Sequence, residues 1–202
     1  ITRGLENATA GKIPYTNFAV QSNRFQYDTA AGGASKRVTF PYFTHAIIQL
    51  GTNDFGTGGR TLAQVQTDLL AMAAELKAVT GPYGKKIHVA VCKLLPRILT
   101  STDSYATIAN QTAYYNAAFA PGGDRDLYNT WLDTQVGVTI DSVINPNPYV
   151  EYSGGNKWAV AADVTATTGT ANYATADGTH LRTQGAINAS AAVTAWANTL
   201  TV

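Results

Sequence analysis

The sequence has few charged residues, a single cysteine and no long apolar run. Charged residues make up 13% of its 202 residues, below the usual share of about 25%. Fourteen basic and thirteen acidic residues nearly cancel, so neither nucleic acid nor an anionic membrane surface is expected as a partner. No apolar stretch approaches the roughly 18 residues of a membrane span. The sequence is therefore expected to form one globular domain, and it is long enough to bury a substantial core.

Cys92 is the chain's one cysteine, which rules out an internal disulfide and a cysteine-ligated metal site. It lies in the apolar stretch IHVAVC, where a small buried side chain is its expected role. We expect no metal and no cofactor. The polarity of the chain comes from neutral residues, chiefly Thr, Asn, Gln, Ser and Tyr. Such a surface is typical of extracellular or secreted proteins that face carbohydrate, virion-associated proteins included.

Two short apolar runs, at 44–50 and 86–95, predict buried parallel strands. Between them, residues 61–79 place Leu, Val and Met side chains on one helical face. Thr61 with Gln64 predicts a capping box at the start of that helix. Strand, helix and strand at this spacing indicate a right-handed crossover onto a parallel sheet.

Three more elements complete the prediction: a helix over about 104–119, a strand over 136–144 and a closing helix over 186–200. Together they predict a three-layer α/β/α sandwich with a central parallel sheet. Residues 145–176 differ, because Pro, Gly, Asn and Thr are frequent and no helical period is present. A loop this long in a compact domain is usually functional. We therefore expect an irregular insertion there.

Two short motifs lie where chemistry is expected in such a fold. GTND, at 51–54, follows the first apolar strand, and DGTH, at 177–180, precedes the closing helix. Active sites of open parallel sheets lie beyond the carboxyl ends of the strands, so side chains of both loops are expected to converge. An Asp three residues before a His suits a pair in which Asp177 orients His180 as a base. The alternative is a surface turn in which the two meet by chance.

In their order, spacing and position, Gly51-Thr52-Asn53-Asp54 and Asp177-Gly178-Thr179-His180 resemble two sequence blocks of the SGNH (GDSL-like) hydrolases. That family carries four blocks: Gly-Asp-Ser with the nucleophile, a glycine block, Gly-x-Asn-Asp and Asp-x-x-His. The resemblance covers nearly the whole chain except the insertion. It implies a flavodoxin-like α/β/α fold and a serine hydrolase.

The first block is not in this sequence, but the opening Ile1-Thr2-Arg3-Gly4 resembles its usual continuation, Ile-Thr-x-Gly. The resemblance thus implies a nucleophilic serine immediately before Ile1. The strand that ends at this serine would lie beside the strand 44–50, and its loss would leave buried backbone groups unpaired. We expect the segment that carries it to accompany this chain as a separate or cleaved piece, or to be joined through a modified serine.

The second block resembles NFAVQSN at 17–23, with Asn17 and Val20 in register and Ser22 where the family has Gly. The resemblance assigns the oxyanion hole to the Asn53 side chain, the Ser22 backbone N–H and the serine itself. Asp54 is expected to stabilise its loop. Two simpler interpretations stay open: Asn53 as a turn residue, and Ser22 as a nucleophile in its own right.

Aromatic residues gather in the insertion beside the DGTH loop, among them Tyr152 and Trp158. Aromatic faces stack on sugar rings, which predicts substrate binding by these two residues. The alternative is that they fix the long loop on the domain. His45 and His88 lie in the strands and are expected to be structural.

The sequence therefore predicts a serine esterase that cleaves acetyl or other short acyl esters, with an acylated glycan as the favoured substrate. Its rival is a catalytically silent SGNH-like module that binds carbohydrate or serves as structure. The residues before Ile1 discriminate between the two: Gly-Asp-Ser there favours the enzyme, and its absence favours the silent module.

Overall fold

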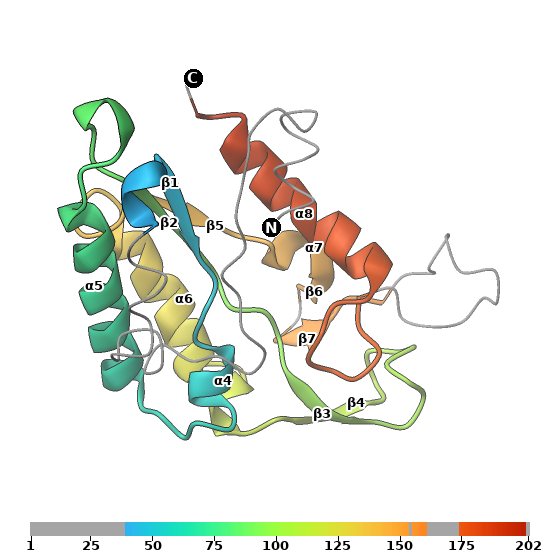
Figure 1. Cartoon of the computed structure of the whole chain (residues 1–202). Helices are drawn as coiled ribbons and strands as arrows, with labels where there is room; N and C mark the ends of the chain where they lie inside the picture. The colour runs from blue at the N-terminus through green and yellow to red at the C-terminus, as the bar shows by residue number, and fades with distance from the viewer. Residues whose placement is uncertain (1–38, 154, 161–173, 201–202) are drawn as a thin grey trace. The chain divides into compact units, whose positions relative to one another are not determined.

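The structure, a computed structural model, describes residues 39–153, 155–160 and 174–200 (Figure 1). These residues fall into two compact units. The sheet unit comprises residues 39–94 and 124–144, and the hairpin unit comprises the described residues of 95–123 and 145–200. The predictions for Ile1–Gly4, for residues 17–23 and for Ser22 lie outside the described residues. None of the described helices is long and apolar enough to cross a membrane.

The sheet unit contains three parallel strands in the order β1 (His45–Ile48), β2 (His88–Cys92) and β5 (Ser142–Ile144). β2 is central and pairs with both neighbours. Its Val89, Ala90 and Val91 are completely buried. The predicted strands at 44–50 and 86–95 are confirmed. β5 covers the last third of the predicted strand 136–144, because a turn with Gly137 at φ +78° precedes it.

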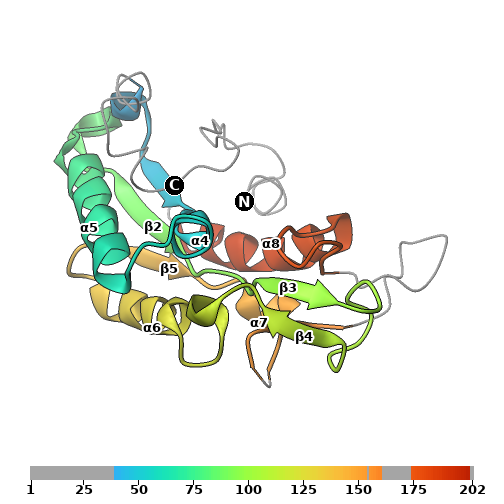
Figure 2. The same cartoon turned by 90° about the horizontal axis from the view of Figure 1, so that it is seen from below.

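Helices α5 (Leu62–Ala78) and α6 (Asp124–Gln135) lie side by side against the sheet of this unit (Figures 1 and 2). The predicted capping box of α5 is present, since Thr61 and Gln64 exchange hydrogen bonds between side chain and backbone. α5 buries an apolar stripe made of Val65, Leu69, Ala73 and Leu76. Shorter elements of the unit are η2 (Phe40–Tyr42), α4 (Thr52–Phe55) and η3 (Pro82–Gly84).

Helix α6 has no counterpart in the sequence prediction, because two of the four side chains that it buries are polar. Arg125 is 1% exposed and Asn129 is 8% exposed. The Arg125 Nε–H and the Asn129 Nδ2–H both donate to the Leu94 carbonyl, and the Leu94 N–H donates to Asn129 Oδ1. These bonds fix the backbone just beyond β2. A helix anchored in this way contains few apolar residues, so a search for apolar stripes passes over it.

Two antiparallel hairpins and three helices make up the described part of the hairpin unit. β3 (Ile98–Ser101) pairs with β4 (Gln111–Tyr114), and β6 (Glu151–Tyr152) pairs with β7 (Lys157–Trp158). α7 (Asn147–Val150) packs against α8 (Thr183–Ala197). A single-turn helix, η4 (Ala117–Phe119), follows β4. One buried apolar cluster of the unit comprises Ile98, Tyr105, Val150, Trp158, Ala174 and Ala189.

The helix predicted over 104–119 is wrong; this stretch forms the turn of the β3–β4 hairpin, β4 and η4. Asp103 determines the turn. Its carboxylate accepts hydrogen bonds from the side chains of Ser101, Thr107 and Asn110 and from the Ala106 N–H. The hydrogen bond from Thr107 has the largest effect on the pKa of Asp103. Together with the other hydrogen bonds it lowers this pKa to about 2, although partial desolvation acts in the opposite direction. Local side-chain acceptors offer the backbone an alternative to a helix, which explains the failed prediction.

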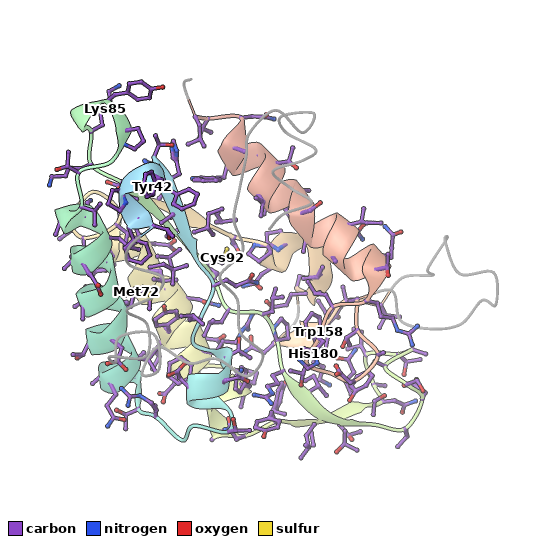
Figure 3. All side chains as sticks on the ribbon, viewed as in Figure 1. Tyr42, Met72, Lys85, Cys92, Trp158 and His180 are labelled. Atoms are coloured by element: carbon purple, nitrogen blue, oxygen red, sulfur yellow. The ribbon has the colours of Figure 1, made fainter. Side chains whose placement is uncertain are left out.

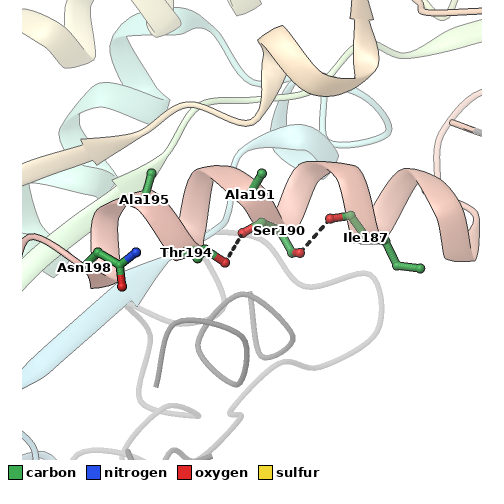
Figure 4. A pocket seen from close by; sticks show the side chains of 6 residues that line it. All are labelled: Ile187, Ser190, Ala191, Thr194, Ala195 and Asn198. Carbon is green, nitrogen blue, oxygen red and sulfur yellow. Dashed lines mark hydrogen bonds between the residues drawn. The ribbon is translucent and has the colours of Figure 1, made fainter. Parts of the chain in front are cut away.

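The insertion at 145–176 is more regular than predicted, since it contains α7, β6 and β7; residues 161–173 lie outside the described residues. The predicted closing helix is present as α8, which begins and ends three residues earlier than expected. One face of α8 lines a shallow hollow with Ile187, Ser190, Ala191, Thr194, Ala195 and Asn198 (Figure 4). The Ser190 and Thr194 hydroxyls there donate to carbonyls of their own helix, at 2.6 and 3.0 Å.

The chain is thus a mixed α/β protein whose central parallel sheet is flanked by helices, which confirms the predicted fold class. Cys92 is buried at the end of β2, as expected (Figure 3). Burial raises the pKa of its thiol to about 12, so that it remains protonated and unreactive.

Candidate active site

Asp177 and His180 form a carboxylate–imidazole pair in the loop that precedes α8. The His180 Nδ1 lies 2.6 Å from Asp177 Oδ2. The other carboxylate oxygen, Oδ1, accepts the backbone N–H groups of Thr179 and His180 at 2.9 and 2.8 Å. The His180 side chain, labelled in Figure 3, is 81% exposed. Because Nδ1 is engaged by Asp177, Nε2 is the ring nitrogen that can exchange a proton with a substrate or a nucleophile.

The hydrogen bonds of Asp177 keep its carboxyl ionised. Burial alone would raise its pKa, but the hydrogen bonds from the His180 side chain and from the two backbone N–H groups outweigh burial. Together with the charge of His180 they lower the pKa of Asp177 to about 2. The group is therefore an anion at neutral pH, the form in which a carboxylate can orient a histidine that acts as a base.

Thr175 closes the base of the loop. Its side chain is buried, and its Oγ1 donates to the His180 carbonyl at 2.7 Å and accepts the Gly178 N–H at 3.0 Å. Thr175 also forms a bridge with Leu181. Hydrogen bonds among residues 175–181 thus fix the backbone on both sides of His180.

Gly178 attaches the loop to the rest of the hairpin unit. Its carbonyl accepts two hydrogen bonds at 2.8 Å, from the Ile98 N–H and from the Trp158 Nε1–H. Its φ is +76°, and a Cβ at this position would lie 2.1 Å from the Ile98 carbonyl oxygen. The loop can approach β3 this closely because residue 178 has no side chain.

Trp158 lies beneath the loop, where it cannot serve as a platform for sugar rings. It is completely buried, and both its backbone N–H and its carbonyl are hydrogen-bonded to the side chain of Gln111. The substrate contact predicted for Trp158 is therefore wrong for this residue. Its position fits the alternative interpretation, in which it fixes the long loop on the domain.

Tyr152 is 44% exposed and pairs with Lys157 across the β6–β7 hairpin. Adjacent residues of a strand point to opposite faces, so Tyr152 lies on the face of the hairpin opposite to Trp158. Substrate binding by Tyr152 stays a prediction.

Arg97 contacts the same loop and was not predicted. Its Nε–H donates to Thr179 Oγ1 at 3.3 Å, and its guanidinium carbon lies 3.7 Å from the centroid of the Tyr115 ring. The residue is 7% exposed. The signal in the sequence is a cation inside an apolar run, LLPRIL, because a charge in such a run must be paired when it is buried.

Asn53 lies in α4 of the sheet unit, directly after the carboxyl end of β1 as predicted. Gly51, at φ +117°, is the N-cap of this single helical turn. The Gly58 N–H donates to the Asn53 carbonyl, so the chain turns sharply around Asn53. Asp54 is completely buried, and its role in stabilising the loop stays a prediction.

Of the predicted site residues, the structure brings Asp177 and His180 together. Asn53 belongs to the sheet unit and Ser22 lies outside the described residues, so their roles in an oxyanion hole stay predictions. No three His, Cys, Asp or Glu side chains of the described residues cluster as metal ligands do.

No protein-family model and no curated protein sequence matches the chain. Among solved structures it is similar to a carbohydrate acetylesterase from Sinorhizobium meliloti, Est24. The TM-score is 0.52 and the identity is 14%, with 90% of this chain and 70% of that chain covered. At this identity the likeness shows the fold, and the resemblance to SGNH hydrolases in sequence remains a prediction at the level of the family.

Proposed function

We propose that the chain is a serine-type carboxylic ester hydrolase that removes acetyl or other short acyl groups. The observation that carries this proposal is the Asp177–His180 pair, with its 2.6 Å contact, its ionised carboxylate and its exposed imidazole. An oriented imidazole of this kind is the base that a serine hydroxyl needs in order to attack an ester.

In the proposed reaction the serine oxygen attacks the acyl carbon while His180 accepts the hydroxyl proton at Nε2. The C–O bond of the ester then breaks, and His180 returns the proton to the departing alcohol. Water, activated in turn by His180, hydrolyses the acyl-serine. The sequence resemblance puts this serine immediately before Ile1.

The oxyanion that forms in each step needs hydrogen-bond donors. We assign this role to the Asn53 side chain, the Ser22 backbone N–H and the N–H of the serine. One such donor is worth roughly 2.7–4 kcal/mol of transition-state stabilisation.

An acylated carbohydrate is the proposed substrate class. The structural neighbour is itself a carbohydrate acetylesterase, and the low share of charged residues fits a surface that binds neutral polar ligands.

A fluorophosphonate probe tests the proposal without knowledge of the substrate. The protein, prepared together with the residues that precede Ile1, is treated with the probe, its intact mass is measured, and the labelled peptide is sequenced. We expect one adduct, on the serine before Ile1. His180→Ala should abolish both labelling and hydrolysis of p-nitrophenyl acetate, whereas Asp177→Asn should leave a small residual activity. His45→Gln is the matched control for loss of a histidine and should label normally.

Two outcomes contradict this assignment. Turnover at the wild-type rate in His180→Ala would show that His180 is not the base. Absence of both labelling and hydrolysis in the wild type, with retained binding to acetylated glycans, would favour the silent carbohydrate-binding module.

A further inference from the structure

We propose that Arg97 is a positioning residue for the Asp177–His180 pair, which it reaches through Thr179. The inference rests on the proposed function, because it assigns Arg97 a part in the same reaction. All the residues involved belong to the hairpin unit.

The guanidinium of Arg97 is fixed in place. Its central carbon lies over the ring of Tyr115, 3.7 Å from the ring centroid, and its Nε–H donates to the Thr179 hydroxyl. With 7% of the residue exposed, the cation has lost most of its contact with water. Cation–π stacking and planar hydrogen bonding, which Arg combines better than Lys, offset part of that loss.

Thr179 links this cation to the catalytic pair. Its backbone N–H donates to Asp177 Oδ1, the oxygen that also accepts the His180 N–H. A shift of the Thr179 side chain therefore moves one of the donors that hold the carboxylate against the imidazole. Because Thr179 directly precedes His180 in the chain, the same shift changes where the imidazole points.

The charges around Arg97 favour its cationic form. Burial lowers the pKa of Arg97, while Tyr115 and the Asp177 carboxylate raise it again. The geometry above carries the positioning role, since the hydrogen bonds of Asp177 to His180 and Thr179 already keep its carboxyl ionised.

A residue that orients a base without touching the substrate should affect kcat rather than KM. In Arg97→Met, which keeps most of the apolar stem, we expect kcat for p-nitrophenyl acetate to fall on the order of 10- to 100-fold, as misplacement of a catalytic group does. KM should stay close to that of the wild type. Arg97→Lys restores the charge without the planar fork and should recover part of the loss. Thr179→Val removes the acceptor of the Arg97 Nε–H, and its kcat should also fall.

Lys157→Met is the matched control. It removes one cation from the same unit, but the Lys157 Nζ donates to the Ile108 carbonyl rather than to the DGTH loop. Its kcat should be that of the wild type.

A second measurement does not depend on activity. In 15N-labelled protein, amide exchange of Thr179 and His180 should accelerate in Arg97→Met and stay unchanged in Lys157→Met. If the wild type hydrolyses no ester, this comparison alone decides the matter, and unchanged exchange in Arg97→Met and Arg97→Lys overturns the positioning role. If the wild type is active, equal kcat in the wild type, Arg97→Met and Thr179→Val overturns it. Should Arg97→Met fail to fold, Arg97→Lys and Thr179→Val carry the same comparison.

Discussion

Gly178 has a left-handed backbone conformation and leaves no space for a side chain. A substitution at this position should therefore be destabilising for two separate reasons. In Gly178→Ala the new Cβ would lie 2.1 Å from the Ile98 carbonyl oxygen and 2.6 Å from the Tyr105 hydroxyl. The loop must then move away from β3, which displaces His180 two residues later. We expect the free energy of unfolding, measured in urea, to fall by about 1–3 kcal/mol, and esterase activity to be lost.

Gly137 provides the control, because it has nearly the same φ, +78°, with nothing within 4 Å of a new Cβ. Gly137→Ala should show the cost of the left-handed backbone, about 1–2 kcal/mol, and keep its activity. Equal loss of activity in both variants would contradict the role assigned to the contact with Ile98.

His45 predicts a pH dependence of stability. Burial, and the charge of His88 whose ring centroid lies 5.3 Å away, lower the pKa of His45. The unfolded chain, with an ordinary His pKa of about 6.5, therefore takes up this proton at a higher pH than the folded protein does. Stability should decrease as the pH falls below about 6.5, and less so in His45→Gln. Urea midpoints at pH 7.5 and 5.5 measure this. The same pH dependence in both proteins would contradict the assignment.

Among the elements, the β6–β7 hairpin carries two aromatic residues, Trp158 and Tyr152, whose substitution should have opposite effects on stability and on substrate preference. Trp158→Phe removes the buried indole N–H from the Gly178 carbonyl and should cost about 2 kcal/mol of stability. Because the loop of His180 is then less well fixed, hydrolysis of an acetylated glycan and of p-nitrophenyl acetate should suffer alike.

Tyr152→Ala changes an exposed residue and should alter stability by no more than about 0.5 kcal/mol. If Tyr152 binds the glycan, the variant should lose about 1–2 kcal/mol of transition-state stabilisation on the glycan and almost nothing on the small ester. Equal effects on both substrates would exclude a role of Tyr152 in recognition.

Helix α6 is hydrogen-bonded through polar side chains to the backbone that follows β2. Substitution of Asn129 tests how much these hydrogen bonds stabilise the protein. Asn129→Ala leaves the Leu94 N–H without its acceptor in a buried position and should cost about 1–3 kcal/mol. Thr134→Ala, on the same helix, also removes a hydrogen bond to a backbone carbonyl, but at an exposed position. It should stay within about 0.5 kcal/mol of the wild type, as determined by thermal or urea unfolding.

The elements predicted correctly are those whose burial is apolar and local. β1, β2 and α5 have runs or stripes of Ile, Val, Leu and Ala, and the signal for each lies within the element itself. The failures share the opposite property. The turn at Asp103 and the anchoring of α6 by Arg125 and Asn129 depend on hydrogen bonds to particular backbone groups, and a hydrophobic pattern carries no information about these.

For the whole molecule, the sequence predicted the α/β class and the pairing of Asp177 with His180. The pair was predictable because only two residues separate its members within one loop. Arg97 and Trp158 reach the same loop from 82 and 20 residues away, through Thr179 and Gly178. Contacts over such separations follow from the folded chain, which is why Arg97 was missed and Trp158 was given a role at the surface.

The hydrogen bond from the Trp158 indole to Gly178 gives the protein an intrinsic optical reporter. Indole emission shifts to longer wavelength when water reaches the ring. The Trp158 ring is buried, and it is hydrogen-bonded to Gly178, which lies two positions before His180 in the chain. In a variant that keeps Trp158 as its sole tryptophan, with Trp131 and Trp196 replaced by Phe, a red shift would mark separation of the loop from its support. The colour of the emitted light would then show, in real time and without a substrate, whether the loop that carries His180 stays in contact with its support.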